Sequence, residues 1–157
     1  MVRKSCLFHG AYYVFGSEPG QVYNELMKLR ILIADDAPFI HEVLKAHLKI
    51  YPDASVHSVF DGLELIEKYD SIDPHIVFVD LAMPKKNGLQ ATRAILQRHP
   101  HAKLVAISSM ASDDIVAEAI ASGCVDFLDK SFKVEEFRET VDSLVAGFVK
   151  ERNVVNG

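Results

Sequence analysis

Residues 29–36 read Leu-Arg-Ile-Leu-Ile-Ala-Asp-Asp, a short apolar run that ends at two carboxylates. A run of this length and character is typical of a strand buried on both faces of a parallel sheet. The pattern recurs at residues 75–80, His-Ile-Val-Phe-Val-Asp, and at residues 103–108, Lys-Leu-Val-Ala-Ile-Ser. The three runs therefore predict three strands that each carry an oxygen-bearing side chain at the carboxyl end.

Amphipathic segments separate the apolar runs, with apolar residues at the three- and four-residue spacing of a half-buried helix. In the first of them the apolar stripe begins at Phe39, and Pro38 suits the first helical turn. Gly123 is placed to end a later helix as a C-terminal cap. The predicted strands are 29–34, 54–59, 75–79, 103–107 and 125–128, and the predicted helices are 38–50, 63–69, 89–96, 113–121 and 134 to about 150.

Strands and helices alternate along the chain, and helical crossovers connect parallel neighbours. The pattern therefore predicts an α/β domain with a doubly wound, five-stranded parallel sheet. Ligands bind such sheets at the carboxyl ends of the strands. The length of 157 residues, with 49% hydrophobic and 25% charged residues, is ordinary for one globular domain.

The composition disfavours several classes of partner. The formal net charge is -5, whereas binding to nucleic acid needs clustered lysine and arginine. No apolar run reaches the roughly 20 residues of a membrane span, so we expect no membrane contact. The two cysteines lack metal-ligand spacing and fit a reducing, cytoplasmic setting. The histidines are scattered, and we expect structural or solvated roles for them.

The expected domain organisation has three parts: an N-terminal extension at 1–26, a folded domain at 27–152 and a tail at 153–157. The extension has no clear period and two glycine-containing breaks. One hypothesis is that Met27 is the true initiator. The rival hypothesis is that aromatic residues of the extension pack on the domain or on a partner.

Five polar residues follow the predicted strands: Asp35, Asp36, Asp80, Ser108 and Lys130. In a parallel sheet they lie at one edge. Clustered carboxylates repel one another, and Mg²⁺, which prefers oxygen ligands, relieves that repulsion. A phosphoryl group on one carboxylate would be held by the cation, the lysine and the hydroxyl together. Each residue alone would be read as a helix cap, a turn residue or a surface lysine; the joint placement favours a phosphoryl-transfer site.

Residues 29–150 resemble the receiver domain of bacterial response regulators, close to the stand-alone chemotaxis and phosphorelay receivers. Four blocks carry the resemblance, in order and at the spacing of that family. They are Ile31-Leu32-Ile33-Ala34-Asp35-Asp36, Val79-Asp80-Leu81-Ala82-Met83-Pro84 with Gly88 after it, Ala106-Ile107-Ser108-Ser109, and Phe127-Leu128-Asp129-Lys130.

The resemblance implies a flavodoxin-like fold and a set of roles at the acidic edge. It implies that Asp80 accepts the phosphoryl group. It also implies that Asp35 and Asp36 hold Mg²⁺ together with Asp80 and the backbone carbonyl of Ala82.

Further roles are implied for the residues around the phosphoryl group. Lys130 contacts that group, Ser108 is the switch hydroxyl, and Phe127 fills the aromatic switch position. The donor would be a phosphohistidine on a sensor histidine kinase or a histidine phosphotransfer protein. Because the chain ends soon after the last predicted helix, we expect output through a phosphorylation-switched surface that binds a downstream target protein.

Three residues depart from or qualify the family pattern. Ser131 stands where the family usually has a proline after the lysine, in a cis peptide, so the placement of Lys130 becomes a question for the structure. Ala82 and Met110 flank the route of attacking water in this family and are both apolar here. We therefore expect slow loss of the phosphoryl group.

Two other functions compete with a phosphorylated signalling module that is not otherwise an enzyme. The first is a pseudo-receiver that binds partners constitutively, which the intact polar set disfavours and Ser131 keeps open. The second is an aspartyl-phosphate hydrolase of a related fold. That class needs an Asp-x-Asp pair, whereas Leu81 and Ala82 follow Asp80 here. Chemotaxis and phosphorelay roles are equally compatible with these residues.

Overall fold

The computed structural model describes residues 28–83 and 85–155. The proposed extension and Met27 lie outside the described residues, as do Pro84 and the last two residues. Five parallel strands form one sheet in the order β2-β1-β3-β4-β5, which confirms the predicted doubly wound α/β fold. The strands are β1 (Arg30–Ala34), β2 (Ser55–Val59), β3 (Ile76–Asp80), β4 (Leu104–Ser108) and β5 (Asp126–Asp129).

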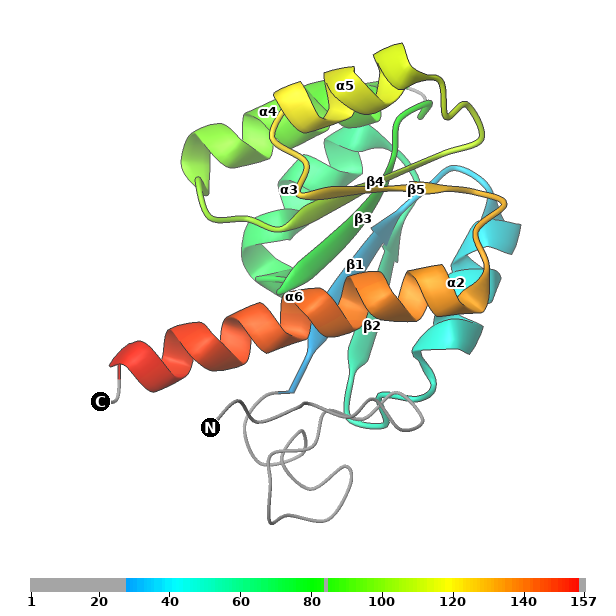
Figure 1. Cartoon of the computed structure of the whole chain (residues 1–157). Helices are drawn as coiled ribbons and strands as arrows, with labels where there is room; N and C mark the ends of the chain where they lie inside the picture. The colour runs from blue at the N-terminus through cyan, green and yellow to red at the C-terminus, as the bar shows by residue number, and fades with distance from the viewer. Residues whose placement is uncertain (1–27, 84, 156–157) are drawn as a thin grey trace.

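Helices cover both faces of the sheet, as Figure 1 shows: α2 and α6 lie on one side, and α3, α4 and α5 on the other. The described helices are α2 (Pro38–Leu48), α3 (Gly62–Ile72), α4 (Gly88–Arg98), α5 (Asp113–Ala121) and α6 (Val134–Val155). None of the helices in the described ranges is both long and apolar enough to cross a membrane.

Side chains of the central strands alternate between two hydrophobic clusters, because successive residues of a strand point to opposite faces. In β1, Ile31 and Ile33 pack with α2 and α6, whereas Leu32 and Ala34 pack with α3, α4 and α5. The edge strand β2 differs: its residues alternate between exposed and partly buried before Val59. The expectation of burial on both faces therefore holds for the inner strands and fails at this edge.

Local capping explains why several helices begin and end where they do. Pro38 opens α2, where its missing N–H costs no hydrogen bond. The Asn87 side chain and Gln90 form a reciprocal capping box at the start of α4. Gly123 follows α5 with a φ of 103°, a left-handed conformation that favours glycine and supports its prediction as a cap.

Two predictions about helices were wrong. Helix α6 does not end near residue 150; it continues to Val155, into the predicted tail, because neither proline nor glycine occurs between residue 150 and Gly157. Phe39 does not join the buried stripe of α2, because its side chain is 74% exposed. It lies in the first turn of the helix, beside the residues that follow β1.

Candidate functional site

The parallel register brings the ends of four strands together. Ala34 pairs with Val79, so Asp35 and Asp80 emerge side by side from β1 and β3. At the other end of the row, Ser108 pairs with Asp129, and the next residue is Lys130. The predicted residues therefore lie along one edge because strand register places them there.

Three carboxylates form a group that fits a hard divalent cation. One oxygen from each of Asp35, Asp36 and Asp80 lies within 4.8 Å of the others. Asp35 and Asp80 are buried, while Asp36 is exposed. Oxygen donors of this kind, with one side open to water, match the ligands and retained hydration of Mg²⁺.

Lys130 completes the charge arrangement. Its Nζ lies 2.9 Å from Oδ2 of Asp35 and 3.3 Å from Oδ2 of Asp80. The Lys130 backbone N–H donates to the Ser108 carbonyl at 2.8 Å, which extends the β4–β5 ladder by one residue. The described residues contain no cis peptide, so Lys130 reaches the carboxylates with Ser131 after it in a trans peptide.

Electrostatics couples the buried groups. Burial is the largest effect on Asp80 and raises its pKa, and the nearby charge of Asp35 raises it further. The Ala82 N–H, 3.1 Å from Oδ1, and the Lys130 ammonium act in the opposite direction. The net result is a pKa of Asp80 above its usual range. Burial alone would lower the pKa of Lys130, but Asp35 and Asp80 more than offset this and raise it. The ammonium therefore holds its proton firmly between two carboxylates.

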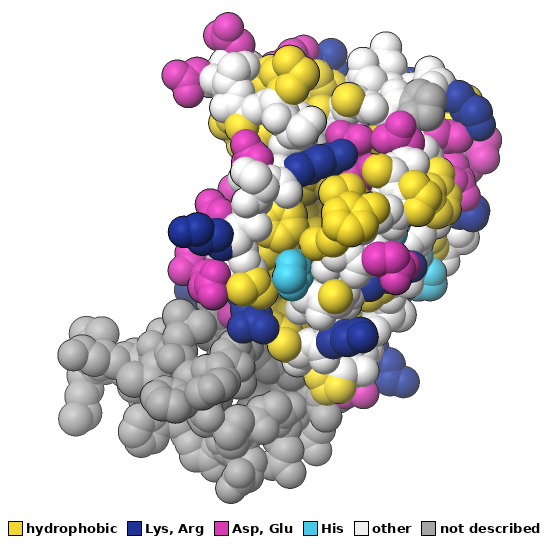
Figure 2. All heavy atoms as spheres, turned by 90° about the vertical axis from the view of Figure 1, so that its right-hand side faces the viewer, with side chains coloured by type: hydrophobic (Ala, Val, Ile, Leu, Met, Phe, Trp, Pro, Cys, Tyr) yellow, Lys and Arg dark blue, Asp and Glu magenta, His cyan; other side chains and the backbone are white. Residues whose placement is uncertain are grey.

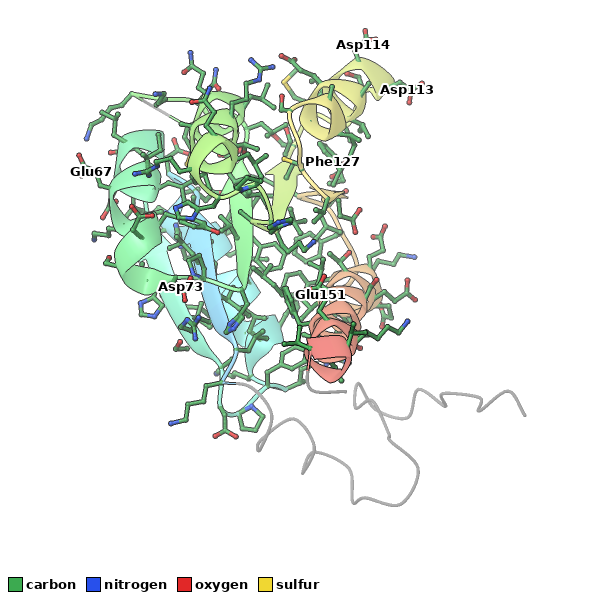
Figure 3. The ribbon with its side chains drawn as sticks, turned by 90° about the vertical axis from the view of Figure 1, so that its left-hand side faces the viewer. Glu67, Asp73, Asp113, Asp114, Phe127 and Glu151 are labelled. Atoms are coloured by element: carbon green, nitrogen blue, oxygen red, sulfur yellow. The ribbon has the colours of Figure 1, made fainter. Side chains whose placement is uncertain are left out.

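Ser108 ends β4, and Phe127 lies on the neighbouring strand β5, opposite Ala106. Ser108 is buried, and its Oγ accepts a hydrogen bond from the Met110 N–H at 3.1 Å. Phe127 is half-buried on β5 and packs against the cluster beneath α3, α4 and α5 (Figure 3). Met110 is 65% exposed and Ala82 is exposed, and both have apolar side chains.

Two close approaches hold the loop between β3 and α4 against its neighbours. A Cβ added to Gly88 would lie 2.1 Å from the Asp80 carbonyl oxygen, and one added to Gly62 would lie 1.9 Å from the Lys86 carbonyl oxygen. Lys85, with a φ of 64°, pairs with Asp61 at 2.7 Å. The loop that carries Ala82 is thus packed onto the start of α3.

His41 is a site neighbour that the sequence reading missed. It is buried, and its Nε2 lies 2.7 Å from the Asp35 carbonyl oxygen. Its ring contacts Phe60, with centroids 4.6 Å apart. The role is structural, as expected for the histidines, but it supports the backbone of a site residue. The sequence did hold a signal for this contact, because His41 lies in the first turns of the helix that directly follows Asp35 and Asp36.

Large apolar side chains are exposed on the segments that follow β1, β2 and β4. They are Phe39, Phe60, Leu63 and Met110, which are 74%, 44%, 45% and 65% exposed. Figure 2 faces the right-hand side of Figure 1 and shows hydrophobic side chains in the middle of that face, with charged groups beside them. The edge therefore combines a charged centre with apolar surroundings.

Comparison with known proteins identifies the class to which this fold and site belong. The model of the response regulator receiver domain matches residues 31–142, and the chain belongs to that family. Members of this class are signalling modules.

Two of the relatives are chemotaxis proteins. The chain is 35% identical over 114 residues to the chemotaxis protein CheY of Listeria monocytogenes, covering 73% of this chain and 96% of that protein. It is 34% identical over 118 residues to CheY of Thermotoga maritima, covering 75% and 98%. Among solved structures, the response regulator domain of Thermotoga maritima CheB is 29% identical, with a TM-score of 0.62 over 80% of this chain and 96% of that one.

Proposed function

We propose that this protein is a response regulator whose receiver domain accepts a phosphoryl group on Asp80. One observation carries the proposal: a lysine ammonium lies within 3.3 Å of both Asp35 and Asp80, beside three carboxylate oxygens within 4.8 Å of one another. An ammonium next to a cation-binding carboxylate group is suited to the dispersed negative charge of a transferring phosphoryl group.

The chemistry follows from the acceptor carboxylate. An Oδ atom of Asp80 attacks the phosphorus of a phosphohistidine, the P–N bond breaks, and the imidazole leaves with its electron pair. The product is an acyl phosphate on Asp80. Lys130 then pairs with the new phosphoryl oxygens and with Asp35, which keeps the added charge neutralised.

Asp35, Asp36, Asp80 and the backbone carbonyl of Ala82 would hold Mg²⁺. Bound there, the cation supplies charge neutralisation for the phosphoryl oxygens. The residues themselves do the positioning: Asp80 is oriented by the Ala82 N–H, and the Asp35 backbone is held by His41.

Phosphorylation then changes a surface. The Ser108 hydroxyl leaves its contact with the Met110 N–H and bonds a phosphoryl oxygen, and Phe127 moves into the space beneath it. Because Phe127 lies on β5, the surface of α5, β5 and α6 changes with it. This is a two-state shift biased by contacts present only in the phosphorylated form.

The partners in this proposal are a phosphohistidine protein and a target. The donor is a sensor histidine kinase or a histidine phosphotransfer protein, and the readout is a protein–protein contact, without direct binding to nucleic acid. The domain's own chemistry is limited to accepting the group and losing it slowly by hydrolysis, because Ala82 and Met110 offer no polar side chain to an attacking water.

Incubation with acetyl phosphate tests the proposal. The wild type gains one phosphoryl group in intact-mass spectra when Mg²⁺ is present and none in excess EDTA, while Asp80→Asn gains none in either. A wild type that stays unmodified would identify a pseudo-receiver. Continuous release of phosphate without accumulation of the modified protein would identify a hydrolase.

A further inference from the structure

The residue after Lys130 closes a turn with the residue before it. Oδ1 of Asp129 accepts two hydrogen bonds from Ser131, one from its N–H at 2.8 Å and one from its hydroxyl at 2.7 Å. The Phe132 N–H donates to the Asp129 carbonyl oxygen at 2.8 Å. Three bonds therefore fold the chain around the single residue between Asp129 and Ser131.

This turn fixes the point from which the Lys130 side chain begins. On the strand side, Asp129 pairs with Ser108, and the Lys130 N–H donates to the Ser108 carbonyl. On the other side the turn itself holds the backbone, and the Phe132 ring that follows it stacks on Phe137 with centroids 5.5 Å apart. A lysine side chain has high rotamer entropy, so an anchored backbone is needed to keep Nζ near two carboxylates.

We propose that Asp129 and Ser131 are positioning residues that place Lys130 at the phosphoryl site. This inference rests on the proposed function. Serine supplies both donors of the turn and proline supplies neither, so the turn is a different solution from the proline usual in the family. The hydrogen bonds from the Ser131 hydroxyl and N–H also lower the pKa of Asp129, which keeps this acceptor ionised at neutral pH.

Substitutions at Asp129 separate the acceptor from the charge. Asp129→Ala removes the acceptor, whereas Asp129→Asn keeps an oxygen at the same position and should rescue the turn. With acetyl phosphate and saturating Mg²⁺, we expect Asp129→Ala to slow phosphorylation about tenfold or more and Asp129→Asn to stay within about twofold of wild type. Asp53→Ala, at an exposed aspartate in the turn before β2, is the matched control.

A double-mutant cycle tests whether the effect passes through Lys130. If Asp129 acts by placing Lys130, then Asp129→Ala causes no further loss in a Lys130→Met background. Additive losses would overturn the proposal. Mg²⁺ affinity provides the second readout: it should be unchanged or tighter in Asp129→Ala, because a displaced ammonium competes less for the carboxylates. Weaker binding of Mg²⁺ would indicate general damage to the site instead.

A measurement without phosphorylation keeps this inference separate from the proposed function. The ion-paired Lys130 ammonium should give a side-chain ¹⁵N–¹H signal that is absent from Lys130→Met. We expect the signal to persist in Asp129→Asn and to vanish or move to the position of solvated lysines in Asp129→Ala. An unchanged signal in Asp129→Ala overturns the positioning role, even if the wild type accepts a phosphoryl group. A wild type that accepts none overturns the proposed function, while the signal still decides the positioning role.

Discussion

Lys130 Nζ lies 2.9 Å from Oδ2 of Asp35, although the two residues follow β5 and β1, which are separated in the sheet by β3 and β4. The lysine side chain therefore extends across the edge of two inner strands and passes Asp80 on the way. In the unphosphorylated domain this ammonium partly offsets the charge of buried carboxylates. It also occupies space near the oxygens that would hold a cation.

Without the Lys130 ammonium, the repulsion between the clustered carboxylates should destabilise the folded state. In the absence of Mg²⁺, we expect Lys130→Met to lower the free energy of unfolding by about 2 kcal/mol, less than for a fully buried pair because the lysine side chain is 19% exposed. Mg²⁺ should restore most of the loss. Urea unfolding with and without Mg²⁺ measures both effects, with the exposed Lys133→Met as control. Equal stability of the two variants in EDTA would contradict this account.

The contact between Gly62 and the loop after β3 makes a second prediction. A methyl group at Gly62 would meet the Lys86 carbonyl oxygen, so Gly62→Ala should destabilise the fold by about 1–3 kcal/mol and displace the loop that carries Ala82. Phosphorylation by acetyl phosphate should slow as well. Gly147→Ala is the matched control: its Cβ would meet nothing within 4 Å, and a helix interior gains about 0.5–1 kcal/mol from alanine. Urea unfolding measures both effects. If the unfolding midpoints of the two variants shifted in the same direction relative to wild type, the contact at Gly62 would be refuted.

Asp142 predicts a pH dependence of stability away from the site. The residue is buried, and burial raises its pKa despite a 2.5 Å hydrogen bond from the Tyr51 hydroxyl and the nearby Arg138. Because the pKa of Asp142 is higher in the folded state, the protonated carboxyl favours folding. That contribution to the free energy of unfolding is fully present below the unfolded pKa of about 3.9 and is lost as pH rises through the folded pKa.

Asp142→Asn should remove that loss. The amide can still accept from Tyr51 and carries no charge at any pH. We therefore expect the variant to gain thermal stability relative to wild type at pH 7 and to gain less at pH 4. Melting curves at the two pH values measure the difference. A larger gain at pH 4 would reverse the sign and disprove the argument.

Loss of the phosphoryl group tests the role of the exposed apolar residues. The wild type should lose it over minutes or longer. Ala82→Asn keeps the backbone carbonyl and adds a group that can hold water, so it should accelerate hydrolysis about tenfold or more. Decay of the phosphorylated form after removal of acetyl phosphate gives the rate, with Met110→Gln as a second variant. A wild-type half-life of seconds would contradict the expected slow loss.

The sequence allowed prediction of the fold and the main polar residues for a simple reason. Parallel strands end at one edge, so residues such as Asp35 and Asp80 could be placed together from strand ends alone. The structure brings them together as expected, while their chemical roles remain predictions. Contacts between distant loops were not predictable in this way. The Asp61–Lys85 pair, the approach of Gly62 to the β3–α4 loop and the contact of His41 with Asp35 depend on how loops pack.

Other misses have local causes. Phe39 follows the helical period of α2, but periodicity does not reveal that no other element covers its side chain, which is 74% exposed. Helix α6 was predicted to end near residue 150, but no proline or glycine follows that position before Gly157, so the sequence holds no signal for its end. Ser131 was read as a missing proline. Its two hydrogen bonds to Asp129 became visible only in three dimensions.

The most direct test of the central claim is to locate the phosphoryl group chemically. Borohydride reduces an acyl phosphate to the alcohol, so an aspartate that carries the group becomes homoserine. After treatment with acetyl phosphate and Mg²⁺, peptide mass spectrometry should find homoserine at position 80, and omission of acetyl phosphate should abolish it. Homoserine at Asp35 or Asp36 instead, or none anywhere, would contradict the assignment of Asp80 as the acceptor.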